Sequence, residues 1–88
     1  MLTRNEKLCL VDLIDERIFL ISSLYTISEE IIELQKEVAK SIKNDNEKDR
    51  LNYSIKLELK HKELQESIVR LNKVSKTIEE FEIKLKSN

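Results

Sequence analysis

The 88-residue sequence contains neither glycine nor proline. Glycine supplies the positive φ angles of tight β-hairpin turns and the close backbone approach of phosphate-binding loops. Proline interrupts helices because it lacks an amide hydrogen and its ring clashes with the preceding turn. The sequence therefore argues against a hairpin-rich β fold and against a P-loop, and nothing in it breaks long helices. The length allows one small domain, which we place at residues 1–88.

Two helix starts are indicated by capping residues. Thr3-Arg4-Asn5-Glu6 has the spacing of a capping box, in which Thr3 and Glu6 each accept a hydrogen bond from the other's backbone amide. Asn46 is a favourable N-cap, and the acids that follow it suit the positive end of a helix dipole. The stretch between them, residues 43–46, is the most turn-like in the chain. We predict a helix over about 4–43, a turn over about 44–46 and a helix over about 47–86.

Apolar side chains recur with a heptad period in the first predicted helix. When Leu10 is placed at position a of the repeat abcdefg, the a and d positions from Leu10 to Ser41 are apolar except at Arg17 and Ser41. Such a repeat is typical of helices that pack along a continuous apolar seam. The a positions are Leu10, Arg17, Leu24, Ile31 and Val38, and the d positions are Leu13, Leu20, Ile27, Leu34 and Ser41.

The second predicted helix has a matching but weaker repeat. Its a positions are Leu57, Leu64, Leu71, Ile78 and Leu85, and its d positions are Lys60, Ser67, Val74 and Phe81. Two helices of equal length predict an all-α, coiled-coil-like antiparallel hairpin. A tight turn would place Leu34 opposite Leu57, whereas a looser turn would shift the pairing by one heptad, and the sequence does not distinguish the two registers.

Residues 22–28 are the one weak segment of the first helix. They are rich in serine, threonine and tyrosine, which are poor helix formers, and Thr26 and Glu29 have the spacing of another capping box. A break here would give three helices instead of two. We expect a continuous helix, because the heptad passes through the segment without a change of phase.

The first helix carries a second apolar row that a two-helix hairpin does not need. Eight of the ten b and e positions from Val11 to Ile42 are apolar or aromatic, and they lie about 100° around the helix from the seam. An exposed patch of this kind marks an interaction surface. The residues that we predict for this interface are Val11, Ile14, Ile18, Ile21, Tyr25 and Ile32.

Three partners would cover this second row. We expect chiefly a second copy of the chain, which would give a homodimeric antiparallel four-helix bundle with the first helices in its interior. A helix or groove of a different protein is the second possibility. A third helix within the same chain, formed by a break in the weak segment, is another.

Few residues suggest catalysis or metal binding. Glu58 and His61 match half of a di-metal carboxylate motif, but their b and e positions do not point into the seam, and such a match is common by chance in a charged helix. Cys9 is expected to be a small, half-buried apolar residue, far from the only histidine. Arg17, at an a position, is expected to extend its head group to water, toward an acid such as Glu79 or Glu82. We predict no enzyme, catalytic residue, metal or cofactor.

The charges are balanced, with 16 basic and 17 acidic side chains. A nucleic-acid-binding protein usually has a basic excess, so we do not expect nucleic acid as the main partner. The longest stretch without charge, Ile18–Ser28, has 11 residues, whereas a membrane span needs about 20. A single cysteine and a start that does not resemble a signal peptide favour a cytoplasmic protein.

These features predict an interaction protein. Our first expectation is a small regulator, inhibitor or adaptor that binds and sequesters a larger protein, an inference from fold-level analogy. A structural coiled-coil assembly protein is the first alternative, and a nucleic-acid-associated transcriptional regulator is the second. The sequence does not identify the partner.

Overall fold

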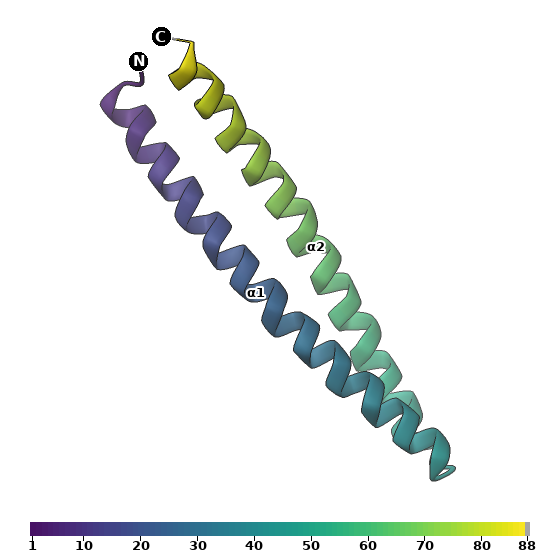
Figure 1. The fold of residues 1–88 in the computed structure, drawn as a ribbon. Helices are drawn as coiled ribbons and strands as arrows, with labels where there is room; N and C mark the ends of the chain where they lie inside the picture. Colours follow the sequence, from purple (N-terminus) through teal and green to yellow (C-terminus); the bar gives the residue numbers. More distant parts are fainter. Residues whose placement is uncertain (88) are drawn as a thin grey trace.

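The protein is a long antiparallel helical hairpin in a computed structural model that describes residues 1–87 (Figure 1). Helix α1 spans Arg4–Lys43 and helix α2 spans Glu47–Lys86, and the described residues include no β-strand. The hairpin measures 65 × 16 × 14 Å, close to the length expected of a 40-residue helix. The predicted all-α helical hairpin is confirmed, and its helices have the ranges that their capping residues indicated.

Helix α1 begins at the predicted capping box. The amide of Glu6 donates to Thr3 Oγ1 at 3.1 Å, and the amide of Thr3 donates to Glu6 Oε1 at 3.1 Å. These two bonds satisfy backbone donors that have no partner within the helix. Helix α2 begins at Asn46, whose side chain accepts from the amide of Asp49 and donates to the Asp49 carboxylate. Each helix start is therefore fixed by local sequence.

The turn is built without glycine. The amide of Asn46 donates to the carbonyl of Ser41 at 2.9 Å, and the amide of Asp45 donates to the carbonyl of Ile42 at 3.1 Å. This pair of bonds is a Schellman motif, which requires a left-handed residue at the position that Asp45 occupies with φ 54°. Aspartate tolerates that conformation better than most residues, although glycine is the usual choice. The polar residues 44–46 thus reverse the chain within three positions.

The two helices pack along the predicted seam. Every a and d position of α1 from Leu10 to Ser41 is buried or half-buried, and so are those of α2 from Leu57 to Phe81. Val74 and Ile78 of α2 are the most enclosed apolar side chains, and Ile78 is only 1% exposed. The prediction is wrong at Leu85, which is exposed in the last turn of α2.

Ser41 explains how a polar residue fits a seam position. It is buried, and its hydroxyl donates to the carbonyl of Glu37 at 2.8 Å, so its polar group is satisfied. Its carbonyl is also the acceptor in the turn. A small side chain here lets α2 begin close to the end of α1.

The ion pairs between the helices show which of the two possible registers the hairpin adopts. The cross-helix pairs are Glu6–Lys84, Glu16–Arg70 and Glu30–Lys60. The tight turn places Glu30 opposite His61, one position from its observed partner. A shift by one heptad would move Glu30 about 10.5 Å along α2, out of reach of Lys60. The hairpin therefore has the tight-turn register.

Helix α1 continues without a break through its weak segment. The hydroxyl of Thr26 bonds back to the carbonyl of Ser22 at 3.4 Å, one turn earlier, rather than starting a new helix. Ile27, at a d position within this segment, is buried. Burial of the seam outweighs the weak intrinsic propensity of the segment.

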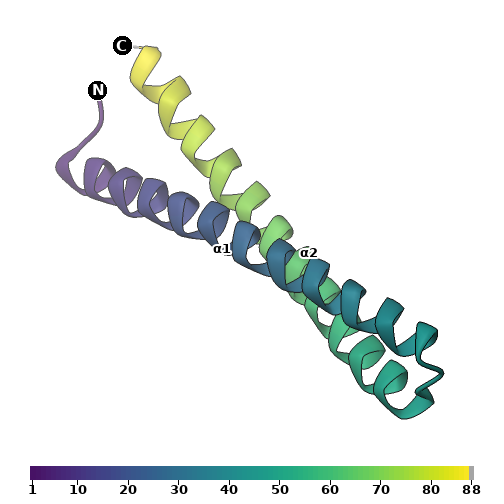
Figure 2. The ribbon, with the colours of Figure 1, turned by 60° about the horizontal axis from the view of Figure 1, so that its bottom comes forward.

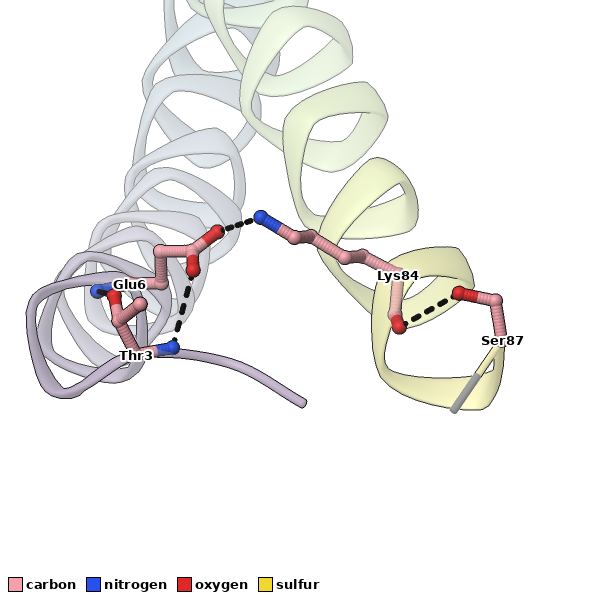
Figure 3. Close-up of polar contacts among 4 residues, drawn as sticks. All are labelled: Thr3, Glu6, Lys84 and Ser87. Carbon is pink, nitrogen blue, oxygen red and sulfur yellow. Dashed lines mark hydrogen bonds and ion pairs between the residues drawn. The ribbon is translucent and has the colours of Figure 1, made fainter.

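The arms diverge toward the end that holds both termini (Figure 2). At that end the chain runs from Thr3 toward α2, and Glu6 and Lys84 form an ion pair between the arms (Figure 3). Leu2 is only 5% exposed, so the N-terminal segment is packed against the hairpin. The pKa of Glu6 is lowered from 4.5 to about 2, first by the bond from Lys84 and then by the backbone amide of Thr3.

The left-handed conformation of Asp45 predicts opposite effects of two substitutions at this position. Asp45→Gly should raise the free energy of unfolding, because glycine adopts positive φ without strain, and Asp45→Val should lower it by about 1–2 kcal/mol. Asn44→Gly is the matched control, since φ at Asn44 is −89° and glycine gains nothing there. Urea unfolding followed by circular dichroism measures the changes. Equal effects of the two glycines would contradict this account of the turn.

The Glu6 pair predicts a loss of stability in acid. Because its pKa is lower in the folded protein, Glu6 stabilises the hairpin above pH 4.5, and this contribution disappears as the pH falls toward 2. Glu6→Gln keeps the capping geometry but loses the charge, so it should melt a few degrees below the parent at pH 7 and together with it at pH 2. Glu79→Gln, on the exposed surface of α2, should leave the whole melting profile unchanged.

Candidate functional site: an apolar stripe on α1

The second apolar row of α1 is left uncovered by the hairpin. We call it the apolar stripe and define it as the eight apolar b and e residues Val11, Ile14, Ile18, Ile21, Tyr25, Ile32, Ala39 and Ile42. All are exposed except Ile14, which is half-buried. Tyr25 is 71% exposed and Ile18 is 58% exposed. The six residues predicted for an interface therefore lie on one side of α1, and five of them are fully accessible.

Two edges flank the seam on α1, the g positions and the e positions. The more polar g edge is the one that lies closer to α2. The g positions Glu16, Ser23, Glu30 and Glu37 are half-buried, whereas Ile21 and Ile42 at e positions are exposed. Burial of the e edge would remove more apolar surface from water. The hairpin thus gives up apolar burial on this side of α1.

Ion pairs to α2 lie along the g edge of α1. The guanidinium of Arg70 donates to both carboxylate oxygens of Glu16, at 2.6 and 3.0 Å, and Lys60 pairs with Glu30. The bond from Arg70 lowers the pKa of Glu16, and the bond from Glu16 raises the pKa of Arg70. The pKa of Lys60 is raised first by Glu30 and then by Glu63. These pairs lie along the g edge of α1, on the opposite side of the seam from the apolar stripe.

The stripe is large for the surface of so small a protein. From Val11 to Ile42 it runs about 46 Å along a helix about 10–12 Å wide, or roughly 500 Å². The largest apolar patch of a typical monomer is about 300–600 Å² and often has a function. Here a patch of that size belongs to a protein of only 88 residues.

A shallow hollow lies near the middle of the stripe. Its volume is about 230 Å³, and Ile21, Leu24, Tyr25 and Ser28 line it. The small side chain of Ser28 leaves room beside the large ring of Tyr25. The centre of the stripe therefore combines a protruding aromatic ring with a depression.

A second hollow lies between the helices and away from the stripe. It measures about 590 Å³, and Leu34 and Leu59 form its apolar floor. Glu29, Glu33 and the Glu30–Lys60 pair stand at its rim. This groove follows the g edge of α1, so a partner on the stripe would leave it open.

Two exposed apolar residues of α1, Leu8 and Phe19, lie outside both the seam and the stripe. Leu8 lies three residues before Val11 and extends the stripe toward the N-terminus, a relation that the i, i+3 spacing reveals. Phe19 is 70% exposed at a c position, on the side of the groove. Its only sequence signal is an aromatic ring on an otherwise polar face.

The residues considered for chemistry do not converge. Glu58 is exposed and His61 is half-buried, and residues 1–87 hold no group of three or more side chains suited to bind a metal. Arg17 is half-buried and makes no ion pair with the exposed Glu79 or Glu82 within the described chain. Cys9, expected to be half-buried, is exposed instead.

Comparisons with known proteins do not assign the chain to a family. No family model matches it, and no curated protein or solved structure matches it either. In residues 1–87, neither helix has an apolar stretch long enough to cross a membrane. Interpretation of the site therefore depends on its own geometry.

The contrast between seam and stripe is testable by alanine substitution. Ile78→Ala should lower the free energy of unfolding by about 2–5 kcal/mol, because it leaves a cavity in the seam. Ile18→Ala should change it by less than about 0.5 kcal/mol in dilute protein, because its side chain makes little contact within one chain. Urea unfolding at low protein concentration compares them. A large loss from Ile18→Ala under these conditions would show that the stripe is covered within the chain.

Proposed function

We propose that this protein is a non-enzymatic interaction module that pairs its apolar stripe with another protein chain. The observation that carries the proposal is the exposure of the apolar stripe along α1, opposite to what hydrophobic burial alone would favour. Removing such a surface from water stabilises an association by about 25 cal/mol per Å² of apolar area, before the entropic costs of binding.

A second copy of the chain is the partner that we place first. The stripe lies about 100° from the seam around α1, so a helix on the stripe and a helix on the seam occupy neighbouring corners of a square. Two hairpins joined along their stripes would form a homodimeric four-helix bundle. Each stripe would then be covered by an identical apolar surface.

Such a dimer would act as a small regulator, inhibitor or adaptor that sequesters a larger protein. The groove between Leu34 and Leu59 supports this role, since it lies on a different edge of α1 from the stripe and stays accessible after self-association. Its apolar floor and charged rim suit a peptide or helix of a partner protein. A structural coiled-coil protein, with ordered self-assembly and no other target, is the alternative.

Direct binding to nucleic acid has less support. Lys60, Arg70 and Lys84 each form an ion pair with a glutamate of α1, so part of the basic charge of α2 is already neutralised. A phosphate contact there would have to displace these pairs. No exposed aromatic row accompanies the basic residues within the described chain.

Disruption of the stripe tests the proposed function. Ile18→Lys with Ile21→Lys places two charges in the middle of the stripe and should reduce the mass of the purified protein from dimer to monomer in light scattering. Ile55→Lys with Val69→Lys is the matched control, because these exposed apolar residues of α2 lie outside the stripe. It should leave the mass unchanged. Circular dichroism confirms that both variants keep their helices.

A pull-down from the native host distinguishes the two roles of such a module. A stoichiometric protein partner would support a regulator or adaptor, and recovery of the homo-oligomer alone would support the structural alternative. A parent protein that is monomeric and retains no partner through the stripe would overturn the proposal.

A further inference from the structure

The stripe has the spacing of a coiled-coil core. Its b and e positions alternate at intervals of three and four residues, as a and d positions do in a coiled coil. Read along the chain, the interval is three residues from b to e and four from e to the next b. In a helix of opposite direction these two intervals are exchanged, so an antiparallel copy fits only where b residues face e residues. This requirement reduces the pairings of two stripes to a few registers separated by whole heptads.

One antiparallel register pairs every position of the stripe. It places Val11 opposite the partner's Ile42, Ile14 opposite Ala39, Ile18 opposite Gln35, Ile21 opposite Ile32, and Tyr25 opposite Ser28. A shift by one heptad in one direction leaves Ala39 and Ile42 without a facing residue. A shift in the other direction leaves Val11 and Ile14 without one. Burial of the apolar surface thus favours the register centred between Tyr25 and Ser28.

The shape of the surface agrees with this register. Tyr25 is the most exposed large side chain of the stripe, and it stands beside the hollow that includes Ser28. In the paired helices each tyrosine ring would face the hollow of the other copy, where serine leaves space. A large side chain opposite a small one is how facing layers interdigitate without voids.

The charges beside the stripe select the same arrangement. The f positions next to the b row are exposed, and their charges change sign along α1, from Asp15 and Glu29 to Lys36 and Lys43. In this register Asp15 lies within about two residues of the partner's Lys36, at both ends of the interface. In a parallel pair the f rows of the two copies would lie on opposite flanks of the interface, so Asp15 and Lys36 would not meet. Opposite charges therefore favour the antiparallel direction.

We infer that two copies of this chain associate through their α1 stripes in an antiparallel register centred between Tyr25 and Ser28, with Asp15 of each copy beside Lys36 of the other. The inference rests on the proposed function, since it specifies the partner of the same stripe. Two stripes together bury roughly 1,000 Å² of accessible surface, about the minimum of a specific interface. The dimer should consequently dissociate on dilution.

Disulfide cross-linking tests the register. In a Cys9→Ser background, Ile18→Cys combined with Gln35→Cys should give a covalent dimer under mild oxidation, because these two positions face each other across the interface. Ile18→Cys alone should stay uncrosslinked, since residue 18 of one copy lies about 25 Å along the bundle from residue 18 of the other. Non-reducing electrophoresis reads the result. Rapid cross-linking of the single variant would indicate a parallel or shifted pair and overturn the inference.

Charge exchange provides an independent test. Asp15→Lys should weaken the dimer about tenfold, because it replaces two attractive pairs by two repulsive ones, and Lys36→Asp should do the same. The combined variant should restore the parent dissociation constant, measured by analytical ultracentrifugation. Additive losses in the combined variant would contradict the assigned register.

The two levels of proposal fail in different ways. One outcome is a dimer that Ile18→Lys with Ile21→Lys dissociates, but that is not cross-linked by the cysteine pair and does not respond to the charge exchange as expected. This outcome would retain the proposed interaction function and refute the register. A monomer whose stripe binds a different protein would also refute the inference while the interaction function stands. A monomer with no partner at the stripe would overturn both.

Discussion

The apolar seam between α1 and α2 is the interaction on which the rest of the structure depends, and it is a thin one. A two-helix hairpin has no third element to close its core, so most seam residues stay half-buried and only a few, such as Ile27, Ile31, Val74 and Ile78, are enclosed. Isolated helices are marginal in water without such packing. The caps, the turn and the cross-helix ion pairs therefore assist a core that is small, and a second interface along α1 would enlarge it.

The rotation of α1 about its own axis connects the fold to the proposed function. Glu16 and Glu30 pair with Arg70 and Lys60 on one edge of α1, and the isoleucines of the stripe face outward on the other edge. Each exposed pair contributes little by itself, about 0–1 kcal/mol, so a monomer loses by leaving the stripe in water. A dimer resolves this conflict, because the seam, the ion pairs and the stripe are then all satisfied at once.

Local patterns predicted most of the fold. The capping box at Thr3, the N-cap at Asn46 and the polar turn fixed the ends of both helices, since capping depends on neighbours within four residues. The pattern failed at Cys9 and Leu85, which are exposed although the heptad places one beside the seam and the other in it. It also passed over Leu8 and Phe19, because they lie at f and c positions, outside the a/d and b/e rows.

The sequence by itself determined two long helices, their ends, their seam faces and the surplus of apolar residues on α1. These follow from the 3.6-residue period and from short-range capping, which a linear pattern records. Only the tertiary structure decided the hairpin register, the continuity of α1 and which edge of α1 faces α2. Those depend on pairs such as Glu16–Arg70, 54 residues apart, and on the left-handed turn at Asp45. Contacts across that distance become defined only when the helices are placed side by side.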